Sequence, residues 1–134
     1  MVNALGVLLQ KLSIAVSLLL VALAQAQPVN VWEGYMQLKK VAACESTGSV
    51  ENEPRQFNSD GSILWGNDPA TGKPVKRDCG ELQINTIAHA KEIATLGLDV
   101  CNSEADNIVY GKILYDREGL TPWFASRNCW SGKR

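Results

Sequence analysis

The segment that decides the fold is Ala43-Cys44-Glu45-Ser46-Thr47-Gly48. The chain before it predicts a helix from Trp32 to Ser46, because apolar side chains recur there at steps of three and four residues, at Tyr35, Leu38, Val41 and Ala42. Glu45 falls on this same apolar stripe. Partial burial keeps a carboxylate protonated to a higher pH, which suits a general acid, but a Glu in the last turn of a helix is also a common surface residue. The position of Glu45 alone leaves both interpretations open.

Three further motifs follow Glu45 in a fixed order. They are Gln56-Phe57-Asn58-Ser59-Asp60-Gly61, Cys79-Gly80-Glu81-Leu82-Gln83-Ile84-Asn85 and Asn107-Ile108-Val109-Tyr110-Gly111, and Leu114-Tyr115 and Pro122-Trp123 come after them. With these gaps the set resembles the lysozyme-like superfamily, in particular the catalytic domain of soluble lytic transglycosylases and the small resuscitation-promoting factors. The resemblance covers about residues 32–130.

The resemblance implies a small α+β domain, mostly helical, with a short β-hairpin or sheet beside the catalytic helix. It implies that Glu45 is the catalytic acid and that a strand containing Gln83 lines the opposite side of a cleft. The chain departs from the family pattern at Glu81, where an apolar residue is usual, and it lacks the Ala-Tyr-Asn-x-Gly segment that often supplies a cleft tyrosine. Tyr110 and Tyr115 remain available, although their helical spacing among apolar residues favours core packing.

The first 26 residues predict a signal peptide. Lys11 precedes an apolar run from Leu12 to Ala24, and Ala24-Gln25-Ala26 has the small-x-small pattern of a cleavage site. We expect cleavage before Gln27 and a protein that is secreted or located in the periplasm or cell envelope. An uncleaved anchor is the alternative, but the run is shorter than the roughly twenty residues of a spanning helix.

Residues 27–134 form a single predicted domain of the lysozyme-like type. Removing residues 1–26 takes away Lys11 and no acidic residue, so 12 of the 13 basic side chains remain against 14 acidic ones. This balance argues against nucleic acid as a partner, because no basic stripe is present to neutralise phosphates. We expect a monomer without stable membrane insertion, whose partner is the glycan strand of peptidoglycan.

The four cysteines, Cys44, Cys79, Cys101 and Cys129, all follow the expected cleavage site. An even number in a small exported chain predicts two disulfides, for which the sequence allows three pairings. Similarity to the resuscitation-promoting factors implies Cys44 with Cys129, which leaves Cys79 with Cys101. We expect neither a metal ion nor a cofactor, since no Cys-x-x-Cys pair occurs and His89 is the only histidine.

Turn and cap signals divide the rest of the domain. Residues 63–65 and 82–84 predict short strands, and Thr71-Gly72-Lys73-Pro74 predicts an exposed loop. Asn85 predicts the cap of a helix over 86–96, and Ser103 with Asp106 predicts a capping box for a helix that runs to Glu118. Gly111 inside that helix indicates close approach of another helix, and a short turn over 124–130 completes the domain.

The expected chemistry is cleavage of the β-1,4 glycosidic bond between MurNAc and GlcNAc. Glu45 would donate the proton, and the candidates for substrate binding are Ser46, Trp65, Gln83, Asn85 and Tyr110. A strand would project Gln83 and Asn85 to the same face, although Asn85 also fits a simple helix cap. Hydrolytic glycosidases usually need a second carboxylate, for which the candidates are Asp60, Asp68, Asp78 and Glu81.

The absence of an obvious second acid favours a lytic transglycosylase with a single Glu, in which the resemblance implies that the substrate's own N-acetyl and C6 hydroxyl groups complete the reaction. Hydrolysis by a muramidase is the first alternative. The second is an exported peptidoglycan-binding module that keeps the fold without turnover, for which Glu45 would be unnecessary.

Overall fold

The computed structural model describes residues 10–11 and 29–132, and the chain divides into two units, Met1–Asn30 and Val31–Arg134. The expected cleavage site before Gln27 and nearly all of the expected signal peptide lie outside the described residues. Within the described part, no helix has both the length and the apolar character needed to cross a membrane.

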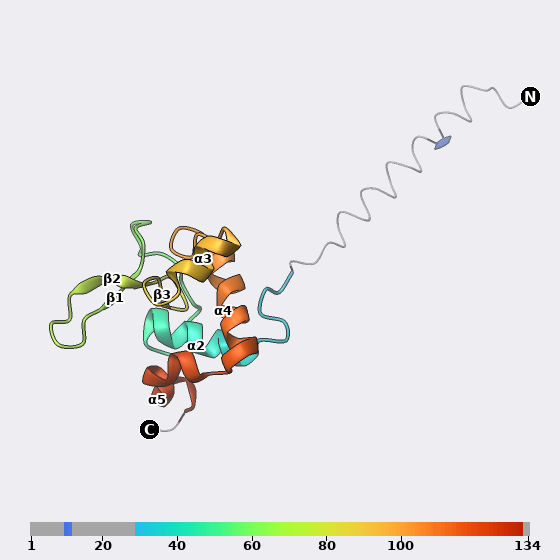
Figure 1. Cartoon of the computed structure of the whole chain (residues 1–134). Helices are drawn as coiled ribbons and strands as arrows, with labels where there is room; N and C mark the ends of the chain where they lie inside the picture. Colours follow the sequence, from blue (N-terminus) through green and yellow to red (C-terminus); the bar gives the residue numbers. More distant parts are fainter. Residues whose placement is uncertain (1–9, 12–28, 133–134) are drawn as a thin grey trace, which may run out of the picture. The chain divides into compact units, whose positions relative to one another are not determined.

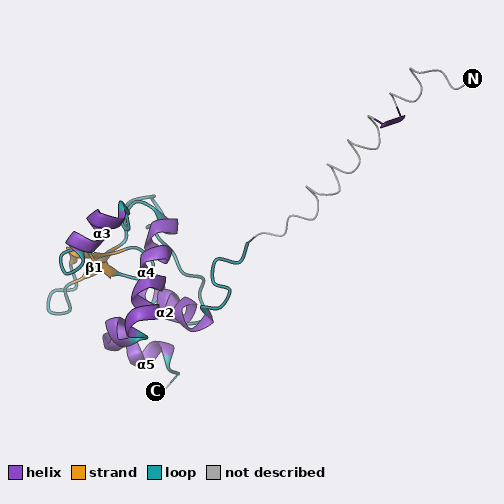
Figure 2. Ribbon diagram, turned by 45° about the vertical axis from the view of Figure 1, so that its right-hand side comes forward, coloured by secondary structure: helices purple, strands orange, loops and turns teal. Residues whose placement is uncertain are grey.

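Helices predominate in the second unit, and one small antiparallel sheet accompanies them (Figures 1 and 2). The elements are α2 (Met36–Thr47), β1 (Trp65–Asn67), β2 (Pro74–Cys79), β3 (Ile84–Asn85), α3 (Ala90–Leu96), α4 (Glu104–Glu118), the 3₁₀ helix η1 (Thr121–Ser126) and α5 (Arg127–Trp130). The α+β class is therefore confirmed. In both views α2 lies between the sheet and α5.

Helix α2 begins later than the sequence predicts, at Met36 rather than at Trp32. A turn precedes it, in which Gly34 has a φ of +77° and the Tyr35 N–H donates to the Trp32 carbonyl. The left-handed backbone of Gly34 cannot belong to an α-helix, so the helix starts only after it. At the other end, α2 extends to Thr47, one residue beyond the predicted end at Ser46, and Gly48 caps it with a φ of +78°.

The sheet has the order β1-β2-β3, with both pairs antiparallel. The strand predicted over 63–65 shares only Trp65 with β1, and the one predicted over 82–84 shares only Ile84 with β3. Leu82 and Gln83 lie instead in a turn, because Gln83 has a φ of +47°, which a strand does not allow. The central strand β2 was not predicted, since its mostly exposed, polar sequence lacks an apolar alternation.

The caps of the two longer C-terminal helices follow their sequence signals in most respects. Helix α3 starts at Ala90, and Asn85 caps the turn before it by accepting hydrogen bonds from the Ile87 and Ala88 amides. The Ser103 side chain accepts from the Asp106 amide at the start of α4. The predicted ends of α3 and α4 are confirmed. The region predicted as a turn over 124–130 instead forms the end of η1 and α5.

Buried amides and one close contact hold the Gly80–Gln83 turn against α4. Asn107 accepts from the Leu82 amide and donates to the carbonyls of Cys79 and Val100. The neighbour of Gly111 is the Leu82 side chain, since a Cβ added to Gly111 would lie 2.1 Å from Leu82 Cδ1. The prediction that another helix approaches Gly111 is therefore wrong. Instead, the missing side chain makes room for this turn.

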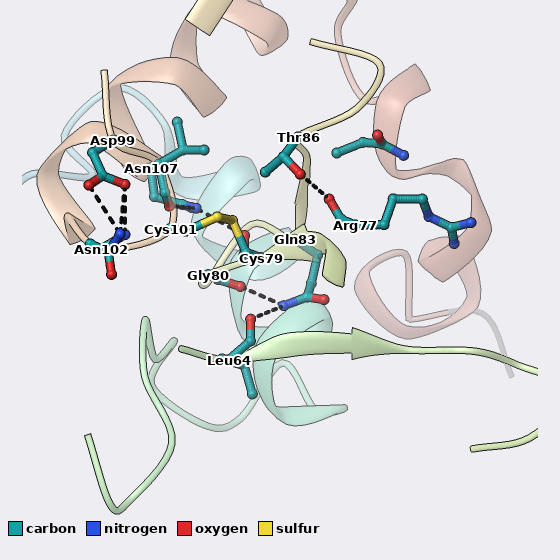
Figure 3. The surroundings of a disulfide bond; sticks show 12 residues. Leu64, Arg77, Cys79, Gly80, Gln83, Thr86, Asp99, Cys101, Asn102 and Asn107 are labelled. Carbon is teal, nitrogen blue, oxygen red and sulfur yellow. Dashed lines mark hydrogen bonds between the residues drawn. A yellow bond between two sulfur atoms is a disulfide. The ribbon is translucent and has the colours of Figure 1, made fainter. Parts of the chain in front are cut away.

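Both disulfides have the pairing implied by the resemblance. Cys44–Cys129 joins the last turn of α2 to α5, across 85 residues of sequence. Cys79–Cys101 joins the end of β2 to the segment before α4 (Figure 3). Together they attach the helix that carries Glu45 to α5 and attach the sheet to the segment leading into α4.

Candidate active site

A cleft of about 500 Å³ lies at the C-terminal end of α2. Its lining residues come from the end of α2, from the loop after it, from the sheet, from the Gly80–Gln83 turn and from η1. They are Glu45, Ser46, Arg55, Leu64, Trp65, Gly66, Asn67, Pro69, Asp78, Gln83, Pro122, Trp123 and Ala125. Segments separated by up to 80 residues in the sequence therefore meet around Glu45.

Glu45 is half-buried in this cleft and has one hydrogen-bond donor. The Ser126 hydroxyl donates to Glu45 Oε1 at 2.5 Å. Burial raises the pKa of Glu45, the Ser126 bond opposes that rise, and the negative charge of Asp78 adds to it. The net effect is a raised pKa, so Glu45 retains its proton to a higher pH than an exposed Glu. This is the property that a general acid requires.

Asp78, on β2, is the second acidic residue that lines the cleft. Its Oδ2 pairs with Arg77 Nε at 3.0 Å. The other three candidates for a second carboxylate lie elsewhere. Asp60 accepts from Ser62, Asp68 accepts from the Ala70 amide, and Glu81 is buried and does not line the cleft. Of the four candidates, Asp78 alone lines the cleft.

Trp65 and Gln83 both line the cleft, as the sequence predicts for substrate-binding residues. The Gln83 amide nitrogen donates to the Gly80 carbonyl at 2.7 Å and lies 3.4 Å from the Leu64 carbonyl (Figure 3). A Cβ added to Gly66 would lie 2.6 Å from Gln83 Oε1. The Gln83 amide is thus held by the backbone on one side and packed against a glycine on the other.

Ser46 also borders the cleft, but its hydroxyl is engaged within the protein. It donates to the Ala42 carbonyl at 2.7 Å and accepts from the Arg55 amide at 3.1 Å. The Ser46 carbonyl accepts from Arg55 Nε at 3.0 Å. Ser46 is therefore better described as the residue that positions Arg55 than as a direct ligand of a substrate.

Asn85 and Tyr110 lie outside the cleft, so their expected role in binding is corrected. The side-chain oxygen of Asn85 caps the turn before α3. Tyr110 is fully buried and its hydroxyl donates to Glu92 at 2.6 Å. Burial and this bond to Glu92 raise the pKa of Tyr110 to about 12. Tyr110 packs in the core, as its helical spacing favours.

Arg55 and Ser126 are candidate functional residues that the sequence did not indicate. Arg55 follows Pro54 in a loop. Basic residues are common in surface loops, so its position gave no signal of a role. Ser126 lies 81 residues after Glu45 and belongs to no motif. Only the packing of η1 against the end of α2 brings its hydroxyl to Glu45, and the nearby Cys129 offers the single sequence hint of that packing.

The chain is a small α+β protein with two disulfides. Its cleft contains two carboxylates, and one of them, Glu45, has a raised pKa. Among the described residues, no group of three or more His, Cys, Asp or Glu side chains is placed to hold a metal ion. Comparison of the chain with protein-family models, with curated proteins and with solved structures finds no match.

Proposed function

We propose that this chain is an exported glycosidase that cleaves the β-1,4 bond between MurNAc and GlcNAc in peptidoglycan, with Glu45 as the general acid. The observation that carries the proposal is the half-buried Glu45 in the cleft, whose pKa is raised by burial and by Asp78. Glycosidic cleavage needs a proton delivered to the leaving oxygen, and a carboxyl group that keeps its proton to a higher pH than an exposed Glu is suited to deliver it.

Other residues of the cleft support binding of a sugar. Trp65 contributes an aromatic side chain, which is suited to packing against the apolar face of a pyranose ring. Gln83 also lines the cleft. Its amide nitrogen is bonded to the Gly80 and Leu64 carbonyls, so its Oε1 is the atom that would accept from the N–H of a substituent such as an N-acetyl group. Neither residue transfers a proton, so their role would be to place the glycosidic oxygen at Glu45.

The position of Asp78 bears on the product. A lytic transglycosylase of the type that the resemblance implies needs only Glu45, and its product is a 1,6-anhydro sugar. A muramidase uses a second carboxylate, which stabilises positive charge on the sugar, attacks it or activates water. Because Asp78 lines the same cleft as Glu45, hydrolysis gains support that the sequence did not give it.

Substitution of Glu45 tests the proposal. Glu45→Gln keeps the size of the side chain and removes the transferable proton, so we expect release of muropeptides from purified peptidoglycan to fall by about a hundredfold or more. Glu33→Gln is the matched control, because Glu33 is exposed and lies outside the cleft. Equal rates for Glu45→Gln and wild type would show that Glu45 is not the acid.

Mass spectrometry of the products distinguishes the remaining alternatives. Anhydro ends that persist in Asp78→Asn indicate the single-Glu lytic reaction, whereas reducing ends that disappear in Asp78→Asn indicate a muramidase. Binding of the wild-type chain to peptidoglycan without release of any muropeptide would replace both with the binding-module alternative.

A further inference from the structure

A second hollow adjoins the cleft and is also about 500 Å³ in volume. Four residues line both spaces, namely Arg55, Leu64, Trp65 and Asn67. The shared residues show that the groove continues past Trp65, away from Glu45 and towards the turn at Asn58 and Ser62. A ligand that extends beyond the sugars on either side of the cleaved bond can therefore occupy both spaces.

Arg55 is the only basic residue among the described residues that line either space. Its backbone amide and its guanidinium Nε both donate to Ser46, so Ser46 holds the backbone of Arg55 and one N–H of its guanidinium. In the described part of the chain, the nearby acids Glu53 and Asp78 pair with Lys39 and Arg77 rather than with Arg55. The terminal N–H groups of the guanidinium are consequently available to an external acceptor.

The second hollow differs in charge from the cleft. The cleft contains Glu45 and Asp78, whereas no acidic residue is among the described residues that line the second hollow. The Asn58 amide nitrogen already donates to Ser62 Oγ and to the Ile63 carbonyl. The main charged group offered to a ligand there is thus a cation, beside the apolar surfaces of Ile63 and Pro74. This combination suits a carboxylate on a partly apolar branch.

We propose that the second hollow binds a carboxylate-bearing side branch of the glycan, held by the Arg55 guanidinium, while the sugar backbone lies across Trp65 into the cleft. The inference rests on the proposed function and assigns to Arg55 the recognition of the carboxylate that distinguishes this glycan from a neutral one. In peptidoglycan the carboxylate belongs either to a free lactyl group or to a peptide attached to it. The shared chemistry is a planar anion matched by a planar, bidentate donor.

Binding measurements with three ligands of equal sugar length test this proposal. They are a peptide-bearing muropeptide, the same glycan with free lactyl groups, and a neutral N-acetylglucosamine oligomer. The protein is the full chain with Glu45→Gln, so that binding is measured by calorimetry without turnover. We expect Arg55→Gln to weaken binding of at least one carboxylate-bearing ligand by about tenfold or more relative to the neutral oligomer, with Arg55→Lys in between. Lys91→Gln removes an equal charge on α3, outside both spaces, and should change none of the three affinities.

The ligand that loses affinity identifies the branch as lactyl or peptide. An equal loss for all three ligands, with a lowered melting temperature, would show that Arg55 acts only through Ser46 and would overturn the proposal. Unchanged affinities in Arg55→Gln would overturn it as well. If none of the ligands binds and the wild-type chain releases no muropeptides, the proposed function itself fails. If the wild-type chain cleaves peptidoglycan but Arg55→Gln does not weaken binding of a carboxylate-bearing ligand relative to the neutral oligomer, only this inference fails.

Discussion

At the scale of the residue, the Ser126 hydroxyl and the Glu45 carboxyl group control when the proposed acid ionises. A hydrogen bond donated to a carboxylate stabilises its charged form, so the Ser126 bond lowers a pKa that burial raises. The carboxyl group and the hydroxyl come from different elements, Glu45 from the end of α2 and Ser126 from η1.

Ser126→Ala should therefore raise the pKa of Glu45 further. In the pH profile of peptidoglycan cleavage, we expect the fall in rate on the alkaline side to move to higher pH. Ser59→Ala, an exposed serine outside the cleft, is the control. A shift of the alkaline side to lower pH would mean that Ser126 does not stabilise the ionised carboxylate.

Glu81 is a second buried carboxyl group. It lies outside the cleft, so we expect its ionisation to affect the stability of the fold rather than the proposed reaction. It is 1% exposed, and its Oε1 has no hydrogen-bond partner within the described structure. Burial, with a smaller effect from the charge of Glu104, raises the pKa of Glu81 to about 8. The folded protein therefore holds this proton more tightly than the unfolded chain does.

The free energy of unfolding should accordingly fall as the pH rises from the ordinary pKa of a Glu towards about 8, by as much as about 5 kcal/mol. Glu81→Gln cannot ionise, so we expect it to reduce this dependence and to be more stable than wild type at pH 9. Urea unfolding at pH 5 and pH 9 measures both. If the free energy of unfolding changes by the same amount between pH 5 and pH 9 in the variant and the wild type, Glu81 is not the group responsible.

At the scale of the element, α4 and the Gly80–Gln83 turn pack through a contact that only glycine permits. The turn is held by Asn107 from α4 and by Trp123, whose indole N–H donates to the Leu82 carbonyl at 2.8 Å. Since Gln83 belongs to this turn and reaches the cleft, the packing of α4 affects the position of a candidate binding residue.

Gly111→Ala tests this packing. Helix propensity alone would favour Ala by about 1 kcal/mol. The added Cβ would nevertheless lie 2.1 Å from Leu82 Cδ1, so we expect a net destabilisation of about 1–3 kcal/mol by urea unfolding. The double variant with Leu82→Ala should lose less than the sum of the two single variants, because it relieves the clash. Additive losses would indicate that the contact is not the cause.

At the scale of the whole molecule, the Cys44–Cys129 disulfide closes the larger of the two loops, with a sequence separation of 85 against 22 for Cys79–Cys101. It also fixes α5, and with it the adjoining Ser126, next to the end of α2. One covalent link thus stabilises the domain and maintains the surroundings of Glu45.

Replacing Cys44 and Cys129 together by Ala should reduce the free energy of unfolding by about 2–5 kcal/mol. We also expect cleavage to weaken at temperatures where the variant is still folded, because the Ser126 hydroxyl is no longer held at Glu45. The double replacement of Cys79 and Cys101 is the comparison, since it leaves the α2–α5 link intact. Full activity without the Cys44–Cys129 disulfide would show that this bond is not needed to hold Ser126 at Glu45.

The sequence by itself determined the local features of this protein. The end of α3 at Leu96, Ser103 as the cap of α4 and the apolar stripe through Leu38 and Val41 depend on backbone conformation and periodicity, which neighbouring residues specify. The resemblance added the disulfide pairing and drew attention to Glu45.

Only the tertiary structure decided which residues meet at the cleft. It placed Asp78, alone of the four candidate acids, in the cleft, brought Ser126 to Glu45 and Arg55 to the lining that Trp65 shares, and left Tyr110 and Asn85 outside. It also placed Gln83 in a turn rather than a strand, because Asn107 and Gly111 of α4 hold that turn in place. The physical reason is distance along the chain. Contacts between residues dozens of positions apart arise from the packing of whole elements, and no local pattern records them.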